Sequence, residues 1–179
     1  MWLRLLALPY LLFLSQGLLA QPGGTIGIPG TCSVTKPFQT SLFVPPPPYE
    51  AKTVKTQFWF GTDRLWTNLP IDGIWKGLPL DTTARHPTFG QKLFWWRQGY
   101  NARAEPQPNL IVTDKRLDDP TTPLEVSPVT PLEVSRATNA FAAPRSAMLV
   151  GLGLPTVGCW QITGRYEDDE LTFVIWVAR

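Results

Sequence analysis

The side chains best suited to chemistry in this sequence are few and widely separated. His86 is the only histidine, and it stands between Arg85 and Pro87 with no nucleophile motif near it. Hydrolytic triads need a nucleophilic serine or cysteine beside a base, most often histidine. An exposed or loop-packing role for His86 is the simpler interpretation, and we predict no catalytic residues.

Metal and cofactor sites have little support. Zinc is bound by several histidine, cysteine or carboxylate ligands at characteristic spacing, and one histidine with two distant cysteines, Cys32 and Cys159, does not supply them. Gly151-Leu152-Gly153 lacks the third glycine and the Lys-Ser/Thr pair of phosphate-binding loops. We expect no metal and no cofactor.

Four consecutive acids, Glu167 to Glu170, suggest two kinds of chemistry. They could bind calcium, or one of them could act with a distant carboxylate as a glycosidase pair. They lack the alternating ligand spacing of a calcium loop, so we interpret them as the solvated tip of a hairpin. A carboxylate-dependent hydrolase that uses other Glu or Asp residues remains an alternative function.

Tryptophan provides the best functional lead. Seven of the eight tryptophans follow residue 20, and an exposed row of indoles can stack on sugar rings. Sandwich cores also contain tryptophan, so burial is the competing interpretation. Adjacent Trp95 and Trp96 must point to opposite faces of a strand, so either both faces are covered there or one ring is exposed. The candidate ligand-binding aromatics are Trp66, Trp75, Trp95 and Trp96, and a coplanar exposed row of Trp66, Trp75 and one of the other two would indicate carbohydrate binding.

Strands must position these side chains, and the clearest strands are near the C-terminal end. Residues 158–166 and 171–177 alternate at period two and are dominated by aromatic and β-branched side chains. This pattern predicts a β-hairpin. Val174 and Trp176, on the second face of the second arm, are also apolar, so we expect that face to be covered too.

The middle of the chain predicts further short strands separated by turns. Proline accounts for 19 of 179 residues, roughly twice average usage, which argues against an α fold. Turns recur at the spacing typical of a sandwich or barrel, and residues 79–87 and 98–109 are expected to be loops. The fold class is therefore all-β, an antiparallel β-sandwich with strands near 55–61, 65–69, 73–77, 91–97, 110–117 and 147–152.

A local duplication lies within the long segment 118–145. The hexapeptide TPLEVS at 122–127 recurs at 130–135, a period far below those of solenoid repeats. We interpret it as a tandem insertion in a loop, with one copy pairing as an edge strand.

Residues 1–20 have the pattern of a secretory signal peptide. Arg4 supplies a positive start, Leu5 to Leu14 are mostly apolar, and small or polar residues lead to a cleavage point near Ala20. An uncleaved anchor is the alternative, but the apolar stretch is short for a bilayer. We expect a secreted or periplasmic protein with no membrane span after cleavage. The formal net charge is +2 with scattered basic residues, so nucleic acid is a poor candidate partner.

Export permits a disulfide, and two cysteines allow one intramolecular pairing. We predict a Cys32–Cys159 disulfide that ties an N-terminal arm to the C-terminal hairpin; two unpaired buried cysteines are the alternative. The expected organisation is a signal peptide (1–20), an irregular N-terminal arm with a proline-rich spacer (21–48) and a β-sandwich domain (49–179). Within the arm, an edge strand around Cys32 and a short strand at 41–44 are candidates. The oligomeric state is not indicated.

Residues 154–177 carry a resemblance. Their motif, Leu-Pro-x-x-Gly-Cys-Trp-x-Ile-x-Gly followed by Leu-Thr-Phe-Val-x-Trp-Val, resembles a set of uncharacterised bacterial secreted proteins that end in a similar hairpin. Residues 92–97 and 109–117 are similar to that set as well. The resemblance implies an immunoglobulin-like β-sandwich and an exported location, and it transfers no site residues because the set has no assigned activity. An antibody-type disulfide does not fit, since Cys32 is too far from Cys159 in sequence.

These observations leave three functional hypotheses. The first is a non-catalytic exported module that binds a protein or a cell-envelope component. The second is a carbohydrate-binding module that uses exposed tryptophans, and the third is the carboxylate-dependent hydrolase. The expected partner is accordingly an extracytoplasmic protein or a glycan. If the tryptophans belong to the core, loops 78–90, 98–109 and 118–145 become the candidate protein-binding rim.

Overall fold

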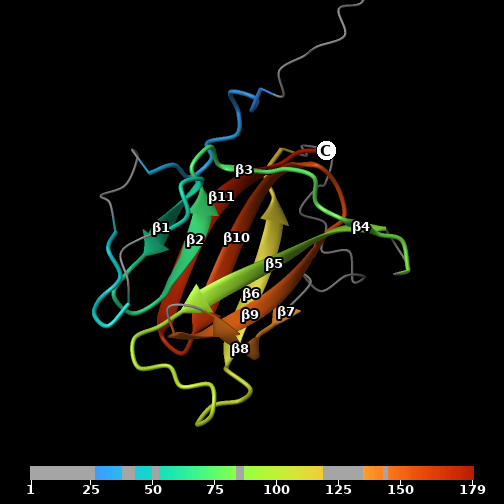
Figure 1. Cartoon of the computed structure of the whole chain (residues 1–179). Helices are drawn as coiled ribbons and strands as arrows, with labels where there is room; N and C mark the ends of the chain where they lie inside the picture. The colour runs from blue at the N-terminus through green and yellow to red at the C-terminus, as the bar shows by residue number, and fades with distance from the viewer. Residues whose placement is uncertain (1–26, 38–42, 50–52, 84–86, 119–134, 143–144) are drawn as a thin grey trace, which may run out of the picture.

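The chain folds into two packed β-sheets (Figure 1). The computed structural model describes residues 27–37, 43–49, 53–83, 87–118, 135–142 and 145–179. Within these residues there is no helix long and apolar enough to cross a bilayer. The strands are β1 (Gln57–Gly61), β2 (Trp66–Pro70), β3 (Ile74–Trp75), β4 (Leu80–Asp81), β5 (Thr88–Trp96), β6 (Leu110–Arg116), β7 (Ser135–Arg136), β8 (Thr138–Ala142), β9 (Arg145–Leu154), β10 (Gly158–Tyr166) and β11 (Asp169–Val177).

The two sheets have different orders. In the first, called sheet A, the described strands run β1-β2-β5-β9-β8, and β4 pairs with the other end of β5. In the second, sheet B, they run β3-β11-β10-β6-β7, with β3 parallel to β11 and the other pairs antiparallel. Figure 1 shows β5 of sheet A crossing in front of β10 and β6 of sheet B. The predicted all-β sandwich is confirmed.

The C-terminal hairpin forms the middle of sheet B. β10 and β11 pair along their whole length, from Gly158 opposite Val177 to Tyr166 opposite Asp169. Their alternate apolar residues face the main core, as the period-two pattern predicted. The predicted four-residue acidic tip is wrong in extent. Asp169 and Glu170 belong to β11, and the turn is completed by Glu167, which has a φ of 53°.

Trp95 is the central contact between the sheets. It points inward from β5 and is fully buried, and its indole lies against Gly164 of β10. A Cβ atom at position 164 would lie 2.4 Å from Trp95 Cη2, well inside van der Waals contact, so the indole requires a glycine there. The neighbouring Trp96 points outward, so β5 is covered on both faces.

Two segments before β1, residues 27–37 and 43–49, cover the outer faces of the sandwich, and together they are called the N-terminal arm from here on. On sheet A, Phe43 and Tyr49 pack with outward-facing aromatics of β1, β2 and β5. On sheet B, Ile28, Cys32 and Val34 pack with Cys159, Val174 and Trp176. The predicted cover over Val174 and Trp176 is therefore confirmed, and residues 27–37 supply it.

Some boundaries differ from those predicted. β4 lies inside the expected loop 79–87, and β8 has no predicted counterpart. Both are short, and each is defined by its hydrogen bonds to a neighbouring strand, β4 to β5 and β8 to β9, and not by a pattern in its own residues. None of the described residues 27–37 is in a strand, although the Thr35 amide donates to Val174 O at 2.9 Å.

Several predictions fall outside the described residues. They concern the signal peptide at 1–20, His86, and most of the duplication. Only Ser135, the last residue of the second TPLEVS copy, is described, and it begins β7 opposite Val112.

Candidate functional site

The four candidate ligand-binding tryptophans are all core residues. Trp66 and Trp95 are 0% exposed, Trp96 is 3% and Trp75 is 6%. Trp75 and Trp95 lie in the core between the sheets, and Trp66 and Trp96 lie under the cover on sheet A. The exposed, coplanar row that would indicate carbohydrate binding is therefore not formed by these residues. Trp75 and Trp95 are enclosed between the sheets, and Phe43 and Tyr49 cover the outer face of sheet A, where Trp66 and Trp96 lie.

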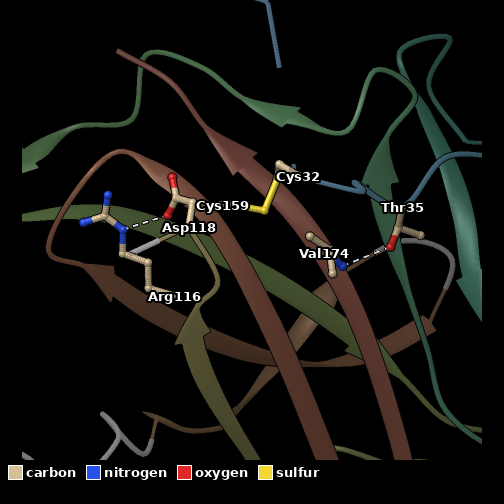
Figure 2. Close-up of a disulfide and its surroundings, with 6 residues drawn as sticks. All are labelled: Cys32, Thr35, Arg116, Asp118, Cys159 and Val174. Carbon is tan, nitrogen blue, oxygen red and sulfur yellow. Dashed lines mark hydrogen bonds and ion pairs between the residues drawn. A yellow bond between two sulfur atoms is a disulfide. The ribbon is translucent and has the colours of Figure 1, made fainter. Parts of the chain in front are cut away.

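The structure joins Cys32 to Cys159 by a disulfide across a sequence separation of 127 (Figure 2). Both residues are buried, at 5% and 1% exposed. The bond lies on the outer face of sheet B, outside the core between the sheets. Next to it, Val174 N donates to Thr35 Oγ1 at 2.9 Å, so the arm is held by both a covalent and a polar contact.

A second polar contact lies on the other side of the disulfide. Arg116 Nε donates to Asp118 Oδ1 at 2.8 Å (Figure 2). The carboxylate occupies the space that a side chain at Gly158 would need, since a Cβ there would lie 2.9 Å from both oxygens. This arrangement supports the start of β10 and has the character of a structural brace.

Three of the four acids at residues 167–170 are paired with arginines. Arg97 Nη1 lies 3.5 Å from Glu167 Oε2, and Arg64 Nε lies 3.1 Å from Asp169 Oδ1. Glu170 pairs with Arg165 across the hairpin. Within the described ranges no group of three or more His, Cys, Asp or Glu side chains is arranged to hold a metal ion. The acids therefore tie turns together at one end of the sandwich.

A partly buried hydrogen-bond network lies at that same end, beside the loop between β5 and β6 (residues 97–109, yellow-green in Figure 1). Tyr166 Oη donates to Glu105 Oε1 at 2.5 Å. The Arg97 guanidinium lies over the Tyr166 ring, with Cζ 4.5 Å from the ring centroid. Burial, together with the bond to Glu105, raises the pKa of Tyr166 to about 12, so the phenol is neutral at ordinary pH.

Two further tyrosines and an asparagine fix the backbone of loop 97–109. Tyr49 Oη donates to Arg97 O at 2.9 Å, and Tyr100 Oη donates to Glu105 O at 3.2 Å. Asn101 Oδ1 accepts from the amide of Arg103 at 2.9 Å. A loop of 13 residues between two strands is thus held in a defined conformation by its own side chains and by Tyr49.

A cavity of about 480 Å³ opens beside this loop. It lies between the end of the arm, the loop and the start of β9. Its lining residues are Pro48, Tyr49, Gly99, Tyr100, Asn101, Arg103 and Ser146. A rigid, partly polar hollow of this size suits a side chain or a small group of a ligand.

The sequence singled out none of these lining residues individually. Loop 98–109 was named as one of three candidate rim loops, and it is the one that the structure connects to the cavity. Pro48 ends the predicted spacer, Tyr49 begins the predicted sandwich domain, and Ser146 lies at the start of β9. No local pattern could have joined them, because the three segments meet only in the folded chain.

Comparisons of the chain with protein-family models, with curated proteins and with solved structures give no match in any of the three.

Proposed function

We propose that this protein is an exported, non-catalytic binding module with an immunoglobulin-like sandwich, and that it binds a protein or cell-envelope component through the cavity beside loop 97–109. The observation that carries the proposal is the pre-formed cavity itself. Its walls are held by the Tyr49, Tyr100 and Asn101 hydrogen bonds, so a ligand meets an ordered loop and little conformational entropy is lost on binding.

The strand order supports the immunoglobulin-like part of the proposal. Immunoglobulin domains have one sheet in the order A-B-E-D and the other in the order C-F-G. Here β4-β5-β9-β8 and β6-β10-β11 follow those orders in the same chain sequence. Trp95 on β5 against Gly164 on β10 makes the inter-sheet contact at the strands that correspond to B and F, where antibody domains have their disulfide.

The buried disulfide supports export. Stable disulfides form in oxidising compartments such as the periplasm or the extracellular space. Both sulfurs belong to residues packed under the arm, and the bond closes most of the chain into one loop. A secreted or periplasmic location is consistent with such a structural bond.

The burial of the tryptophans favours protein binding by the loops over carbohydrate binding by exposed indoles. The seven tryptophans after residue 20 are buried or half-buried, and six of them lie in the aromatic clusters of the two sheets. The acids at the tips form ion pairs with arginines, which favours a stabilising role for them over that of a hydrolytic pair. Loop 97–109 is the candidate rim loop that lines the cavity.

A selection experiment tests the proposal. The protein with its disulfide formed is immobilised and used to select from a library of displayed random dodecapeptides and, separately, to probe a glycan array. Ser146→Trp fills the cavity, and Ser146→Ala at the same position is the matched control that leaves it open.

The proposal expects binders that recognise the wild type, keep most of their affinity for the alanine variant, which removes only the Ser146 hydroxyl, and lose the tryptophan variant by tenfold or more. Circular dichroism and a cooperative thermal transition establish that both variants are folded. Binders that ignore the filled cavity, or an absence of binders in both libraries, would overturn the proposal.

A further inference from the structure

We infer that the cavity takes the carboxylate of an acidic peptide segment, with the Arg103 guanidinium as its counter-ion and Asn101 Nδ2 and Ser146 Oγ as further donors. This inference rests on the proposed function and names the chemistry of that same site. It follows from the charge of the lining residues, from the hydrogen bonds that they already make, and from the burial of the aromatic rings that could otherwise bind a sugar.

The charge of the lining is positive. Arg103 is the only lining residue that is charged at neutral pH. Tyr49 and Tyr100 are the only other lining side chains that ionise, and both phenols donate to backbone carbonyls. Burial raises the pKa of Tyr100 and keeps it neutral. An anionic group is therefore the complement that the cavity favours.

The available hydrogen-bonding groups are donors. Asn101 Oδ1 is occupied by the amides of Arg103 and Ala104, at 2.9 and 3.4 Å, which turns Nδ2 away from the backbone. Among the described residues, Asn101 Nδ2, Ser146 Oγ and the Arg103 guanidinium have no hydrogen-bond or ion-pair partner. A carboxylate accepts from all three kinds of group, and its bond to arginine is charge-assisted.

The lining favours a peptide over an acidic sugar. Sugar rings are bound by stacking on exposed aromatic faces, whereas Tyr49 is 8% and Tyr100 6% exposed. Nothing lies within 4 Å of the position that a Cβ at Gly99 would take, so the loop side is open to a chain that lies along it. An Asp or Glu side chain can enter from such a chain with its carboxylate first.

The experiment uses defined probes and the whole protein. Backbone amide chemical shifts are followed by NMR during titration with an acetylated, amidated Ala-Asp-Ala tripeptide, its Ala-Asn-Ala counterpart, and galacturonate. The variants are Arg103→Gln, Arg103→Lys and, as a matched surface control, Arg64→Gln, which removes an arginine that pairs with Asp169 on another turn.

The inference expects saturable shifts in residues 99–103 and 146 with the Asp peptide, at least roughly tenfold weaker binding of the Asn peptide, and a similar loss in Arg103→Gln. Arg103→Lys should retain part of the affinity and Arg64→Gln all of it. Equal binding of the Asp and Asn peptides, or no saturable shift with either, overturns the inference. Binding of galacturonate alone overturns the peptide assignment. Cavity-dependent peptides selected as above that lack Asp and Glu would leave the proposed function standing and remove this inference.

Discussion

The outer faces of the two sheets are both covered by the N-terminal arm, but they are covered in different ways. On sheet A the cover is non-covalent: Tyr49 packs edge-on against Trp66, with ring centroids 4.8 Å apart, and its hydroxyl bonds to Arg97 O. On sheet B it is fastened by the Cys32–Cys159 disulfide and by Thr35. Sheet A offers large aromatic surface to the arm, and sheet B offers little beyond Val174 and Trp176. The difference indicates that a covalent bond is used where the apolar area is small.

The largest expected effect comes from removing the fastening on sheet B. The double variant Cys32→Ser, Cys159→Ser should lose about 3 to 5 kcal/mol of unfolding free energy, because the disulfide closes a very long loop in the unfolded chain. Guanidinium unfolding followed by tryptophan fluorescence measures it, and the wild type in reductant should approach the variant. An unchanged midpoint would mean that the arm on sheet B is held by packing alone.

Removing the cover of sheet A should have the next largest effect. Tyr49→Ala should cost about 3 kcal/mol, since it removes a buried ring from the cluster around Trp66. Tyr49→Phe keeps the ring and should cost about 1 kcal/mol for the lost bond to Arg97 O. The same denaturant titration measures both. Equal losses of unfolding free energy in the two variants would mean that the hydrogen bond, and not the packing of the ring, holds Tyr49 on sheet A.

Tyr166→Phe examines the network next to this cover. Arg97 joins the two, because its guanidinium lies over the Tyr166 ring and its carbonyl accepts from Tyr49 Oη. The substitution should cost about 2 kcal/mol at neutral pH, because the bond from Tyr166 to the Glu105 carboxylate is charge-assisted. The folded pKa of about 12 is above the ordinary value of 10.0, so the neutral phenol stabilises the fold. That contribution is complete below about pH 10 and is lost as the pH rises towards 12.

The difference in melting temperature between wild type and Tyr166→Phe should therefore narrow between pH 10 and pH 12. Thermal unfolding at half-unit pH steps gives the profile. A constant difference over that range would show that Tyr166 acts by packing only.

Thr35→Val is a smaller change on sheet B. It removes the acceptor of the Val174 amide and should cost about 1 kcal/mol. In the Cys32→Ser, Cys159→Ser background the cost should fall to near zero, because the arm is then no longer held beside β11. An undiminished cost there would show that Thr35 docks independently of the disulfide.

The smallest expected effect is the coupling between the two faces. Tyr49→Ala and the double serine variant act on opposite faces without a shared partner, so their costs should add to within about 0.5 kcal/mol. A larger coupling in the combined variant would mean that the arm covers both faces as one cooperative unit.

The strands with strong alternation were predictable from the sequence. β5, β6, β10 and β11 each carry enough apolar or aromatic residues at period two to define a face. β4 and β8 were not, because they are defined by their partners β5 and β9. The disulfide was predictable because two cysteines allow a single intramolecular pairing.

The burial of tryptophan could not be decided locally. Alternation placed Trp95 and Trp96 on opposite faces, but whether the outer face is covered depends on Phe43 and Tyr49, far away in sequence. The cavity has the same origin, since Tyr49, Arg103 and Ser146 are brought together only by the fold. Long-range contacts of this kind leave no periodic pattern.

The 127-residue separation of the disulfide also sets an order of events. Synthesis proceeds from the N-terminus, so Cys32 emerges long before Cys159, and of the described strands only β11 is made after its partner strand β10. The arm has no docking surface on sheet B until the C-terminal hairpin has formed. Cys32 therefore cannot form this bond until Cys159 has been made, and the bond, once formed, records that the arm has reached the C-terminal hairpin.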